Sequence, residues 1–381
     1  MKIAILGTRG IPNHYGGYEQ FVEYAAPLLV ERGHEVHVYN SSLHPFKGTS
    51  WKGVQLIQKF DPENRIGTAG QFIYDLNCIL DSRKRNYDVI LQLGYTSNSI
   101  WNFLLPGNSV IVTNMDGLEW KRQQYSKWVR RFLKKAEKWA ALNSDFLIAD
   151  STGIQDYLKE EYGKSSAYIA YGAQLMGEGD EGILREVNLE KYGYNLLISR
   201  MEPENNIEMI IQAHLMCDAA KPLIIVGKYT NTFGAYLYKK YSDEKIKFLG
   251  PIFNLHKLNS LRFYSHFYFH GHSAGGTNPS LLEAMASYAL IFAHHNVFNQ
   301  AVLGEDAFYF ESAEEINQLL SRKIDRNDYS HFLKNNAIKI ERDYSWNYII
   351  DLLENFLQFA LEHSAKRKQL SFDGTSKAYT N

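Results

Sequence analysis

Residues 2–20 read KIAILGTRGIPNHYGGYEQ, and this stretch decides the fold class. The apolar run Lys2–Leu6 ends at Gly7, which is typical of a buried strand. A glycine-rich loop follows and leads into Glu19–Arg32, where apolar residues recur at helical spacing as far as Gly33. A strand, a glycine-rich loop and a helix in this order predict the opening of a parallel α/β sheet.

The same alternation continues along the chain in two blocks. In the first block, further strands are predicted at Glu35–Tyr39, Val54–Ile57, Tyr87–Leu91, Ser109–Thr113, Phe146–Ala149 and Ala167–Ala170. In the second block, strands are predicted at Asn195–Ser199, Leu223–Val226, Lys245–Leu249, His266–His270 and Ala289–Phe292. Helical segments separate most of these runs, so we expect two α/β units whose mostly parallel sheets are covered by helices on both faces.

The two blocks set the expected domain organisation. Residues 174–193 interrupt the pattern with several acids and with Gly177, Gly179 and Gly182, as a linker does. The first unit is therefore expected at 1–173 and the second at 194–343. The segment 344–364 has the pattern of a final amphipathic helix, and the polar tail 365–381 is expected to be flexible.

Composition excludes several classes of protein. The 381 residues are enough for two hydrophobic cores, and a net charge of −1 argues against a dedicated nucleic-acid binder. Cys78 and Cys217 are too few and too far apart for a disulfide framework or a zinc site. We expect no cleavable leader, and no stretch approaches the roughly 20 apolar residues of a membrane span. A cytoplasmic protein is therefore expected.

The loop at 7–19 is the first candidate site. It contains four glycines and Arg9, and Gly16 and Gly17 stand where the first helix opens. Backbone N–H groups at a helix N-terminus can surround an anion, and glycines let a ligand approach the backbone closely. The alternative is a tight turn from strand to helix. A nicotinamide cofactor is not indicated, because the loop lacks the G-x-G-x-x-G spacing.

The second candidate site is the end of the strand Asn195–Ser199. Open α/β sheets bind ligands at the carboxyl ends of their strands, and Arg200 stands at this end. A guanidinium is a fixed cation whose geometry suits a diphosphate. The following Pro203 and Glu204 are equally well explained as the start of a helix.

The third candidate site follows the strand His266–His270. Gly275, Gly276 and Thr277 can turn backbone donors onto a phosphate, because a helix is predicted directly after them. Glu283 lies about one turn into that helix, where a carboxylate can accept both hydroxyls of a ribose. The alternative for Glu283 is an exposed acid on a helix surface.

Two weaker hypotheses concern acid–base chemistry and metal binding. Asp116 follows a strand and could orient an acceptor hydroxyl or take its proton, or it could be a turn acid before a glycine. The histidines His270, His272, His294 and His295 include an H-x-H pair, but no further ligand stands at fitting spacing, so no metal is expected. We expect His272 to contact the donor or to pack within its loop.

The segment Ser126–Trp139 combines a helical apolar pattern with many basic residues. Its cations are Lys127, Arg130, Arg131, Lys134, Lys135 and Lys138. They form either a solvated face or a surface that is attracted to anionic lipid. Because the whole chain is nearly neutral, we favour contact with an anionic membrane surface.

These loops, together with residues 116–122 (DGLEWKR), make the chain resemble retaining glycosyltransferases of family four. That family has the GT-B fold of two facing Rossmann-like domains, and the similarity covers about residues 1–360. The first loop and 116–122 look like a bacterial subgroup that includes rhamnosyltransferases of surface polysaccharides. The resemblance implies that the last helix packs on the first domain. It assigns the donor diphosphate to Gly16, Gly17 and Arg200, and the ribose to Glu283.

Two residues depart from the family pattern. Asn205 stands where the family usually has a lysine on the diphosphate. Gly275 stands eight residues before Glu283, where the family usually has a glutamate that touches the donor sugar. This departure disfavours the common gluco donors and leaves room for a sugar of another shape.

The sequence therefore predicts a retaining transferase. It would move a sugar such as rhamnose from a nucleotide diphosphate to a saccharide acceptor, with a lipid-linked acceptor expected. It would need no cofactor beyond the nucleotide sugar and would work on the inner face of the membrane. Catalysis would rest on stabilisation of the departing diphosphate by Arg200 and loop N–H groups. A non-hydrolysing sugar-nucleotide epimerase and a non-catalytic nucleotide-sugar binding protein remain as alternatives.

Overall fold

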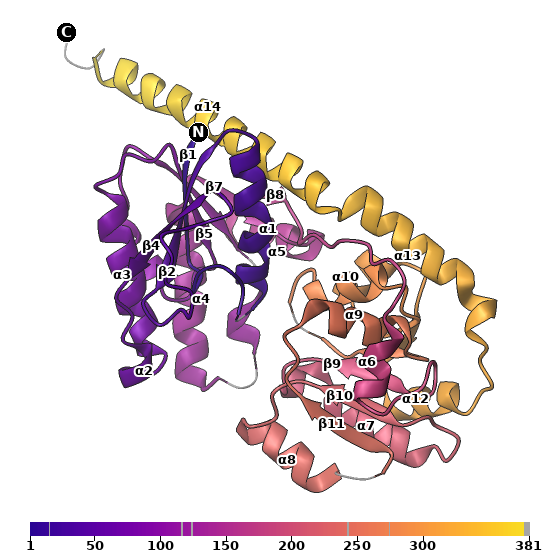
Figure 1. Ribbon diagram of the computed structural model, residues 1–381. Helices are drawn as coiled ribbons and strands as arrows, with labels where there is room; N and C mark the ends of the chain where they lie inside the picture. Colours follow the sequence, from indigo (N-terminus) through magenta and orange to yellow (C-terminus); the bar gives the residue numbers. More distant parts are fainter. Residues whose placement is uncertain (15, 116, 123–124, 242–243, 274, 377–381) are drawn as a thin grey trace. The chain divides into compact units, whose positions relative to one another are not determined.

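The computed structural model describes residues 1–14, 16–115, 117–122, 125–241, 244–273 and 275–376, with side chains up to residue 364 (Figure 1). The chain divides into two compact units. The first consists of Met1–Trp120, Trp128–Ala170 and Trp346–Asn381, and the second of Lys121–Lys127 and Tyr171–Ser345. Nothing in the sequence pattern assigned residues such as Lys121 and Arg122 to the second unit.

The first unit is built on one eight-stranded sheet. Its strand order is β3-β4-β2-β1-β5-β6-β7-β8, and every pairing is parallel except that of β3 with β4. The strands are β1 Lys2–Leu6, β2 Glu35–Ser41, β3 Ser50–Trp51, β4 Val54–Lys59, β5 Val89–Leu93, β6 Val110–Asn114, β7 Phe146–Ala149 and β8 Ala167–Tyr168. The central strands are buried on both faces and therefore read as apolar runs in the sequence.

Helices cover this sheet, and the C-terminal helix returns to it. They are α1 Gly17–Glu31, α2 Glu63–Ile66, α3 Ala69–Ser82, α4 Lys127–Asn143, α5 Thr152–Tyr162 and α14 Trp346–Ser376, with 3-10 turns at Ser99–Leu104 and Glu119–Lys121. The ring of Trp346 stacks on Tyr24 of α1 with 4.4 Å between the centroids, and Glu354 pairs with Arg32 at 3.0 Å. The helix α14 runs to Ser376 and so continues into the segment for which a flexible tail was expected.

The second unit contains a six-stranded parallel sheet in the order β11-β10-β9-β12-β13-β14. The strands are β9 Asn195–Ile198, β10 Leu223–Val226, β11 Ile246–Gly250, β12 Tyr268–His270, β13 Ile291–His294 and β14 Phe308–Phe310. Its helices are α6 Glu181–Glu186, α7 Ile207–Met216, α8 Thr232–Tyr241, α9 Leu255–Phe263, α10 Pro279–Ala286, α11 Val297–Leu303, α12 Ala313–Leu320 and α13 Ser330–Asp343, with 3-10 turns at Pro203–Asn205 and Arg326–Tyr329.

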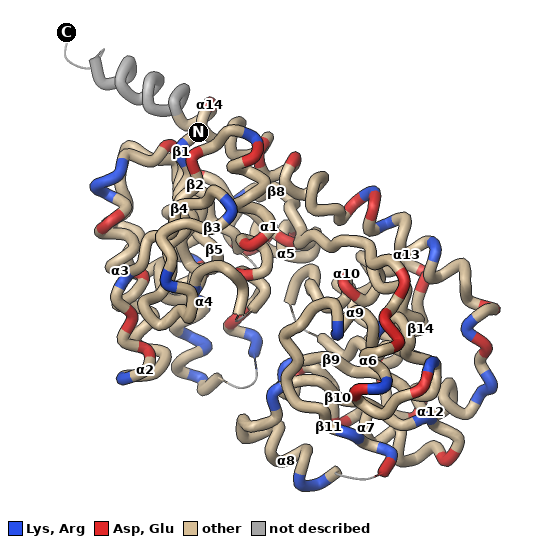
Figure 2. Tube along the Cα trace, in the orientation of Figure 1, with Lys and Arg blue, Asp and Glu red and all other residues tan. Residues whose placement is uncertain are grey.

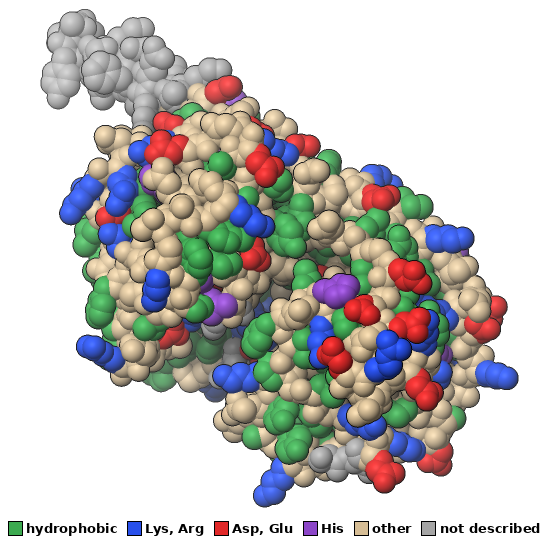
Figure 3. Space-filling view, in the orientation of Figure 1, with side chains coloured by type: hydrophobic (Ala, Val, Ile, Leu, Met, Phe, Trp, Pro, Cys, Tyr) green, Lys and Arg blue, Asp and Glu red, His purple; other side chains and the backbone are tan. Residues whose placement is uncertain are grey.

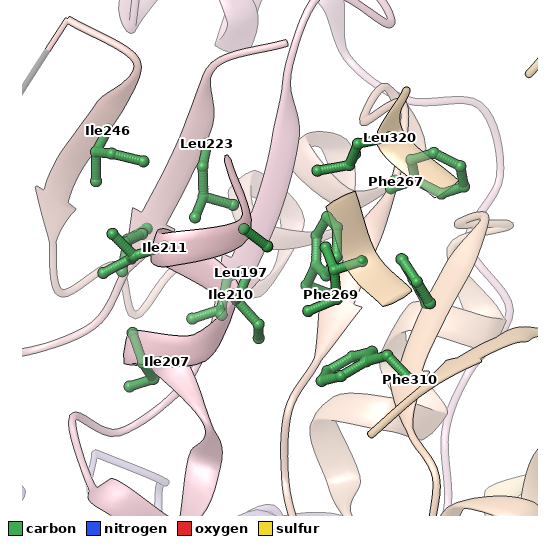
Figure 4. Close-up of a cluster of buried hydrophobic side chains, with 14 of the residues drawn as sticks. Leu197, Ile207, Ile210, Ile211, Leu223, Ile246, Phe267, Phe269, Phe310 and Leu320 are labelled. Carbon is green, nitrogen blue, oxygen red and sulfur yellow. The ribbon is translucent and has the colours of Figure 1, made fainter. Parts of the chain in front are cut away.

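The core of the second unit lies between the sheet and the helices α7 and α12. Figure 4 shows the isoleucines of α7 turned toward side chains of the strands. Fully burying one such aliphatic or aromatic side chain stabilises the fold by about 1.5–3 kcal/mol. The members of this cluster labelled in Figure 4 are Leu197, Ile207, Ile210, Ile211, Leu223, Ile246, Phe267, Phe269, Phe310 and Leu320.

The α/β architecture with two parallel sheets, predicted from the alternating pattern, is confirmed. The segment 174–193 differs from the expected linker, because it contains the helix α6 and belongs to the second unit. Asp180 accepts a hydrogen bond from the N–H of Gly182 and so caps this helix, and Ile183 and Leu184 are buried. Among the described residues, no helix is both long and apolar enough to cross a membrane.

Candidate functional site

Two glycines in the loop after β1 are required by the local backbone conformation and by close packing. Gly7 has a φ of +88°, and a Cβ there would lie 2.2 Å from the carbonyl oxygen of Leu93. Gly10 has a φ of +113°, and a Cβ there would lie 2.3 Å from the side chain of Asn40. For these two glycines, the tight turn that the sequence left open is therefore a sufficient explanation.

Gly16 and Gly17 occupy a different position, at the N-terminus of the helix α1. Gly16 is the N-cap residue, and as a glycine it has no side chain that could cap the helix. The buried carboxylate of Glu19 is turned to the preceding loop, where it accepts a hydrogen bond from the N–H of Arg9 at 2.8 Å. The guanidinium of Arg9 itself binds Glu63 with two hydrogen bonds, of 3.1 and 2.8 Å. The backbone and the side chain of Arg9 thus both form hydrogen bonds that fix the loop before α1.

The loop after β9 presents Arg200 at the carboxyl end of the sheet. The side chain of Arg200 is 69% exposed, and its Nη1 lies 3.6 Å from Oε1 of Glu202. This separation is longer than a hydrogen bond, so the guanidinium is held only loosely. Pro203 starts a 3-10 turn before α7, as the alternative interpretation of this loop predicted.

Asn205 is oriented toward the protein. It is 4% exposed, and its side-chain Nδ2 donates to the carbonyl oxygen of Arg200 at 2.8 Å. Asn205 therefore shapes the loop that carries Arg200, and its amide group is committed to that loop.

A second cation reaches the same loop and was missed by sequence reasoning. Nη1 of Arg122 lies 3.3 Å from Oε2 of Glu202 and 3.9 Å from Oε1 of Glu204. Both carboxylates are buried, so a cation between them offsets their desolvation. Arg122 lies within residues 116–122, on which the family resemblance partly rested. Nothing in the sequence, however, pairs Arg122 with these two acids.

The loop after β12 packs directly against the loop after β9. The N–H and the hydroxyl of Ser273 both donate to the carbonyl oxygen of Glu204, at 3.1 and 2.7 Å. A Cβ at Gly271 would lie 2.1 Å from the carbonyl oxygen of Asn205, so only glycine allows this approach. Because β9 and β12 are neighbours, the two loops form one continuous surface at the carboxyl end of the sheet.

The helix α10 opens from this surface. Asn278 caps it by accepting from the N–H of Ser280 at 2.9 Å, and Pro279 is its first residue. Gly275, Gly276 and Thr277 immediately precede the cap. Gly275 has a φ of +115°, and a Cβ there would meet open space. A side chain at this position would be strained by the backbone and not by its neighbours.

The two histidines of the H-x-H pair lie stacked beneath these loops. Their ring centroids are 4.4 Å apart, and His270 is fully buried. Burial, together with the positive charges of Arg200 and Arg122, lowers the pKa of His272 to about 3. Both rings are therefore neutral at physiological pH. Among the described residues, no group of three His, Cys, Asp or Glu side chains is arranged to hold a metal ion.

Glu283 lies on α10, and its side chain is 14% exposed. Its Oε2 is 2.6 Å from Nη2 of Arg262, an arginine of α9 that sequence reasoning did not select. The structure thus brings Arg200, Asn205, His272 and the loop at 275–277 together in the second unit, with Glu283 one turn into the helix that follows.

The basic helix α4 divides into two sets of cations. Lys134 turns toward the protein, where its Nζ lies 3.2 Å from the buried Glu137, and Arg130 donates to the carbonyl oxygen of Trp120 at 2.7 Å. The remaining four of the predicted cations are exposed; they are Lys127, Arg131, Lys135 and Lys138. We call these four residues the outer basic set. Figure 2 shows the Lys and Arg positions recurring along α4.

Large apolar side chains lie among the outer basic set. Trp128 is 78% exposed, and Arg131 lies over its ring at 5.4 Å from the centroid. Val129 and Leu142 of the same helix are 40% and 47% exposed. By contrast, Figure 3 shows cationic and anionic side chains interspersed on the visible face of the second unit. The cations of α4 thus stand apart through both their density and their apolar neighbours.

Asp116, the second predicted catalytic residue, lies outside the described residues. The residues that follow it are firmly held. The N–H of Glu119 donates to the hydroxyl of Tyr95 at 3.2 Å, and Nε1 of Trp120 donates to Glu137 at 3.0 Å. The role of Asp116 stays a prediction.

The chain resembles solved proteins over nearly its whole length. Sucrose-phosphate synthase from Thermosynechococcus elongatus is 17% identical, with 98% of this chain and 99% of that chain covered and a TM-score of 0.73. HepE of Anabaena in complex with UDP-glucose is 14% identical, with 93% and 98% covered and a TM-score of 0.74. OtsA is 10% identical, with 94% and 99% covered and a TM-score of 0.69.

The fold is GT-B. The fold predicted from the resemblance, including the C-terminal helix that returns to the first unit, is confirmed. Residues 1–174 match a family model that is described as a domain of unknown function, DUF1972. No curated protein matches the chain.

Proposed function

We propose that the protein is a retaining glycosyltransferase that moves a sugar from a nucleotide diphosphate to a saccharide acceptor. The observation that carries this proposal is the surface formed by the loops after β9 and β12 of a GT-B second unit. It presents an exposed guanidinium, Arg200, and the start of the helix α10. Ligands of open α/β sheets bind at this end of the strands, and both groups favour an anion.

In the proposed reaction, the bond between the sugar and the diphosphate breaks as negative charge develops on the diphosphate. Arg200 would leave its loose contact with Glu202 and bind the departing oxygens, and N–H groups at 275–277 would add fixed dipoles. The acceptor hydroxyl would attack from the same face and give its proton to the leaving phosphate. Gly16 and Gly17 are assigned to the diphosphate by resemblance, and that assignment stays a prediction.

We further propose a deoxy sugar such as rhamnose as the donor sugar. The supporting observation is Gly275, whose φ of +115° disfavours the glutamate usual at this position. A site that lacks a hydrogen-bonding group does not reject a sugar that lacks the matching hydroxyl. The resemblance of the first loop and of residues 116–122 to rhamnosyltransferases points to the same sugar.

The acceptor is proposed to be lipid-linked, in the synthesis of a surface polysaccharide. The outer basic set of α4 supports this proposal, because exposed lysine and arginine are attracted to anionic lipid headgroups. The exposed Trp128 between these cations adds a ring of the kind that settles at a membrane interface. The enzyme would then meet its acceptor at the inner face of the membrane.

Mass spectrometry with a panel of nucleotide sugars separates this function from its alternatives. A transferase releases the nucleoside diphosphate and forms a heavier product with a lipid-linked saccharide. An epimerase yields a donor of equal mass and altered retention time, and a binding protein changes neither. Arg200→Ala is the matched inactive control. A clear preference for glucose or N-acetylglucosamine nucleotides, with an inert rhamnose nucleotide, would refute the choice of donor sugar.

A further inference from the structure

A fully buried arginine lies behind the proposed ribose contact. Arg262 of α9 is 1% exposed, which is rare for a cation unless it is paired. Its Nη2 lies 2.6 Å from Oε2 of Glu283 and donates to the hydroxyl of Ser280 at 3.1 Å. Its Nη1 donates to Oδ1 of Asn259 at 2.7 Å. The guanidinium is therefore fixed by α9 and α10 together.

The two partners of this ion pair differ in their exposure. Arg262 is enclosed by protein, and the ring of Tyr268 lies 5.8 Å from its Cζ. Glu283 remains 14% exposed and lies on the helix that opens from the candidate site. One carboxylate oxygen is thus held from inside the protein, while the side chain still reaches solvent.

Stability alone is a weak reason for such an arrangement. A buried ion pair adds little to stability compared with apolar side chains of the same volume. A glutamate that is paired with a buried arginine, by contrast, loses much of its rotamer freedom before any ligand arrives. Binding to a group that is already ordered avoids the entropy cost of ordering it.

We propose that Arg262 is a positioning residue for nucleoside recognition. It holds Oε2 of Glu283 so that the carboxylate is presented to the ribose hydroxyls of a nucleoside diphosphate. This inference rests on the proposed function, in which Glu283 contacts the ribose. Arg262 itself does not touch the ligand.

The test compares two nucleotides that differ only in the hydroxyls that Glu283 would bind. Uridine diphosphate and 2′,3′-dideoxyuridine diphosphate are titrated calorimetrically into wild type, Arg262→Lys and Arg262→Met. Wild type is expected to bind the ribonucleotide about tenfold more tightly. Arg262→Met should weaken only the ribonucleotide and bring the affinity ratio below about threefold. Arg262→Lys, which keeps the charge but loses the fork, should give an intermediate ratio.

Two controls keep the result specific to the carboxylate. Glu283→Gln should also lower the ratio. Lys257→Met, which changes a lysine of α9 that pairs with Glu186 and not with Glu283, should leave it unchanged. Thermal melts check that each variant is folded. If Arg262→Met does not fold, Arg262→Lys decides, because its ratio must still fall below that of wild type.

The proposal is overturned if the Arg262 variants weaken both nucleotides equally, or if the ratio keeps its wild-type value. A purely structural arginine would give the first of these results. If wild type binds neither nucleotide, the proposed function itself fails and this inference falls with it. Binding of the ribonucleotide without any dependence on Arg262 overturns this inference alone.

Discussion

The loop that carries Arg200 and the helix that carries Arg262 place the same side chain in opposite surroundings. The side chain of Arg200 is 69% exposed and has a carboxylate 3.6 Å away, beyond hydrogen-bond distance. The side chain of Arg262 is 1% exposed and has a carboxylate at 2.6 Å and two further hydrogen bonds. A hydrated, loosely held cation can exchange its partner for a ligand, whereas an enclosed cation fixes the partner it has.

Arg122 falls between these two extremes. Its side chain is 22% exposed and lies near two buried carboxylates, so it neutralises the loop that presents Arg200. The exposure of the side chain and its distance to a partner carboxylate therefore distinguish an arginine that can bind a ligand from one that positions another residue. The residue type alone does not. Variants of Arg200 and of the cations on α4 test that distinction directly.

The largest effect is expected from Arg200→Ala. Removing a cation that stabilises charge in the transition state typically lowers turnover by about 10²–10³-fold. Affinity for the nucleoside diphosphate should fall as well, because a hydrogen bond to a charged group contributes about 1.5–3 kcal/mol. Steady-state turnover and calorimetry measure the two effects. Arg322→Ala changes an exposed arginine of the second unit and should be silent; equal losses in both variants would contradict the assignment.

The next largest effect is expected on α4, where exposed cations can be compared with a cation that is paired within the protein. Replacing the outer basic set, Lys127, Arg131, Lys135 and Lys138, by glutamine should weaken binding to anionic vesicles by about 100-fold at low salt. Each basic residue near such a surface contributes about 1 kcal/mol, and some of that is lost to screening. Vesicle co-sedimentation measures it. Lys134→Gln is the matched control, since Lys134 is paired with Glu137. If wild type does not sediment at low salt, the helix is only a solvated face.

A smaller effect is expected from variants of Glu283 and Gly275, which distinguish a contact to the ribose from a contact to the donor sugar. Glu283→Gln should lower turnover about tenfold for every donor and leave their ranking intact, because every donor carries the nucleoside. Gly275→Glu should change the ranking, while Gly275→Ala carries the same backbone strain without the carboxylate. Donor consumption by the three variants is compared with wild type. A ranking that changes in Glu283→Gln would contradict the separation.

The smallest effect concerns Asp75, a buried acid that, unlike Glu283, forms no salt bridge with a cation among the described residues. Burial raises the pKa of Asp75 to about 7, despite the hydrogen bond from Ser97 at 2.5 Å. The folded protein therefore binds this proton more tightly than the unfolded chain, whose ordinary pKa is 3.8. Stability from this group is full below that value and falls as the pH rises toward 7. Asp75→Asn should melt several degrees above wild type at pH 8 and close to it at pH 4. A constant difference at both pH values would contradict this sign.

Much of the fold could be predicted from the sequence because parallel strands are buried on both faces. The predicted runs at residues 2–6, 146–149 and 223–226 coincide with β1 and β7 of the first sheet and with β10 of the second. The strands β3 and β14 were missed, because two and three residues are too short to show a period. These strands lie at sheet edges, where pairing with a neighbour defines them.

The candidate site could be predicted only where a residue stands in a loop motif. Arg200 and Glu283 were proposed on this basis, whereas Arg262 was not selected, because it follows no motif in its helix. The orientation of α4 was also beyond the sequence pattern. Trp128 has the spacing of a packed residue but is 78% exposed, while the charged Glu137 is buried and accepts from Trp120 and three tyrosines. Such pairings join residues far apart in the chain, which a local period cannot reveal.

The central claim is that the second unit binds a sugar nucleotide and releases its sugar. Phosphorus NMR of the donor tests this claim most directly, because the two phosphates of a sugar nucleotide and of a free nucleoside diphosphate give different signals. With wild type and a lipid-linked saccharide, we expect the donor signals of a rhamnose nucleotide to be replaced by those of the nucleoside diphosphate. The same change should be at least about 100-fold slower with Arg200→Ala. Donor signals that persist unchanged with wild type, for every nucleotide sugar and acceptor supplied, would contradict the account.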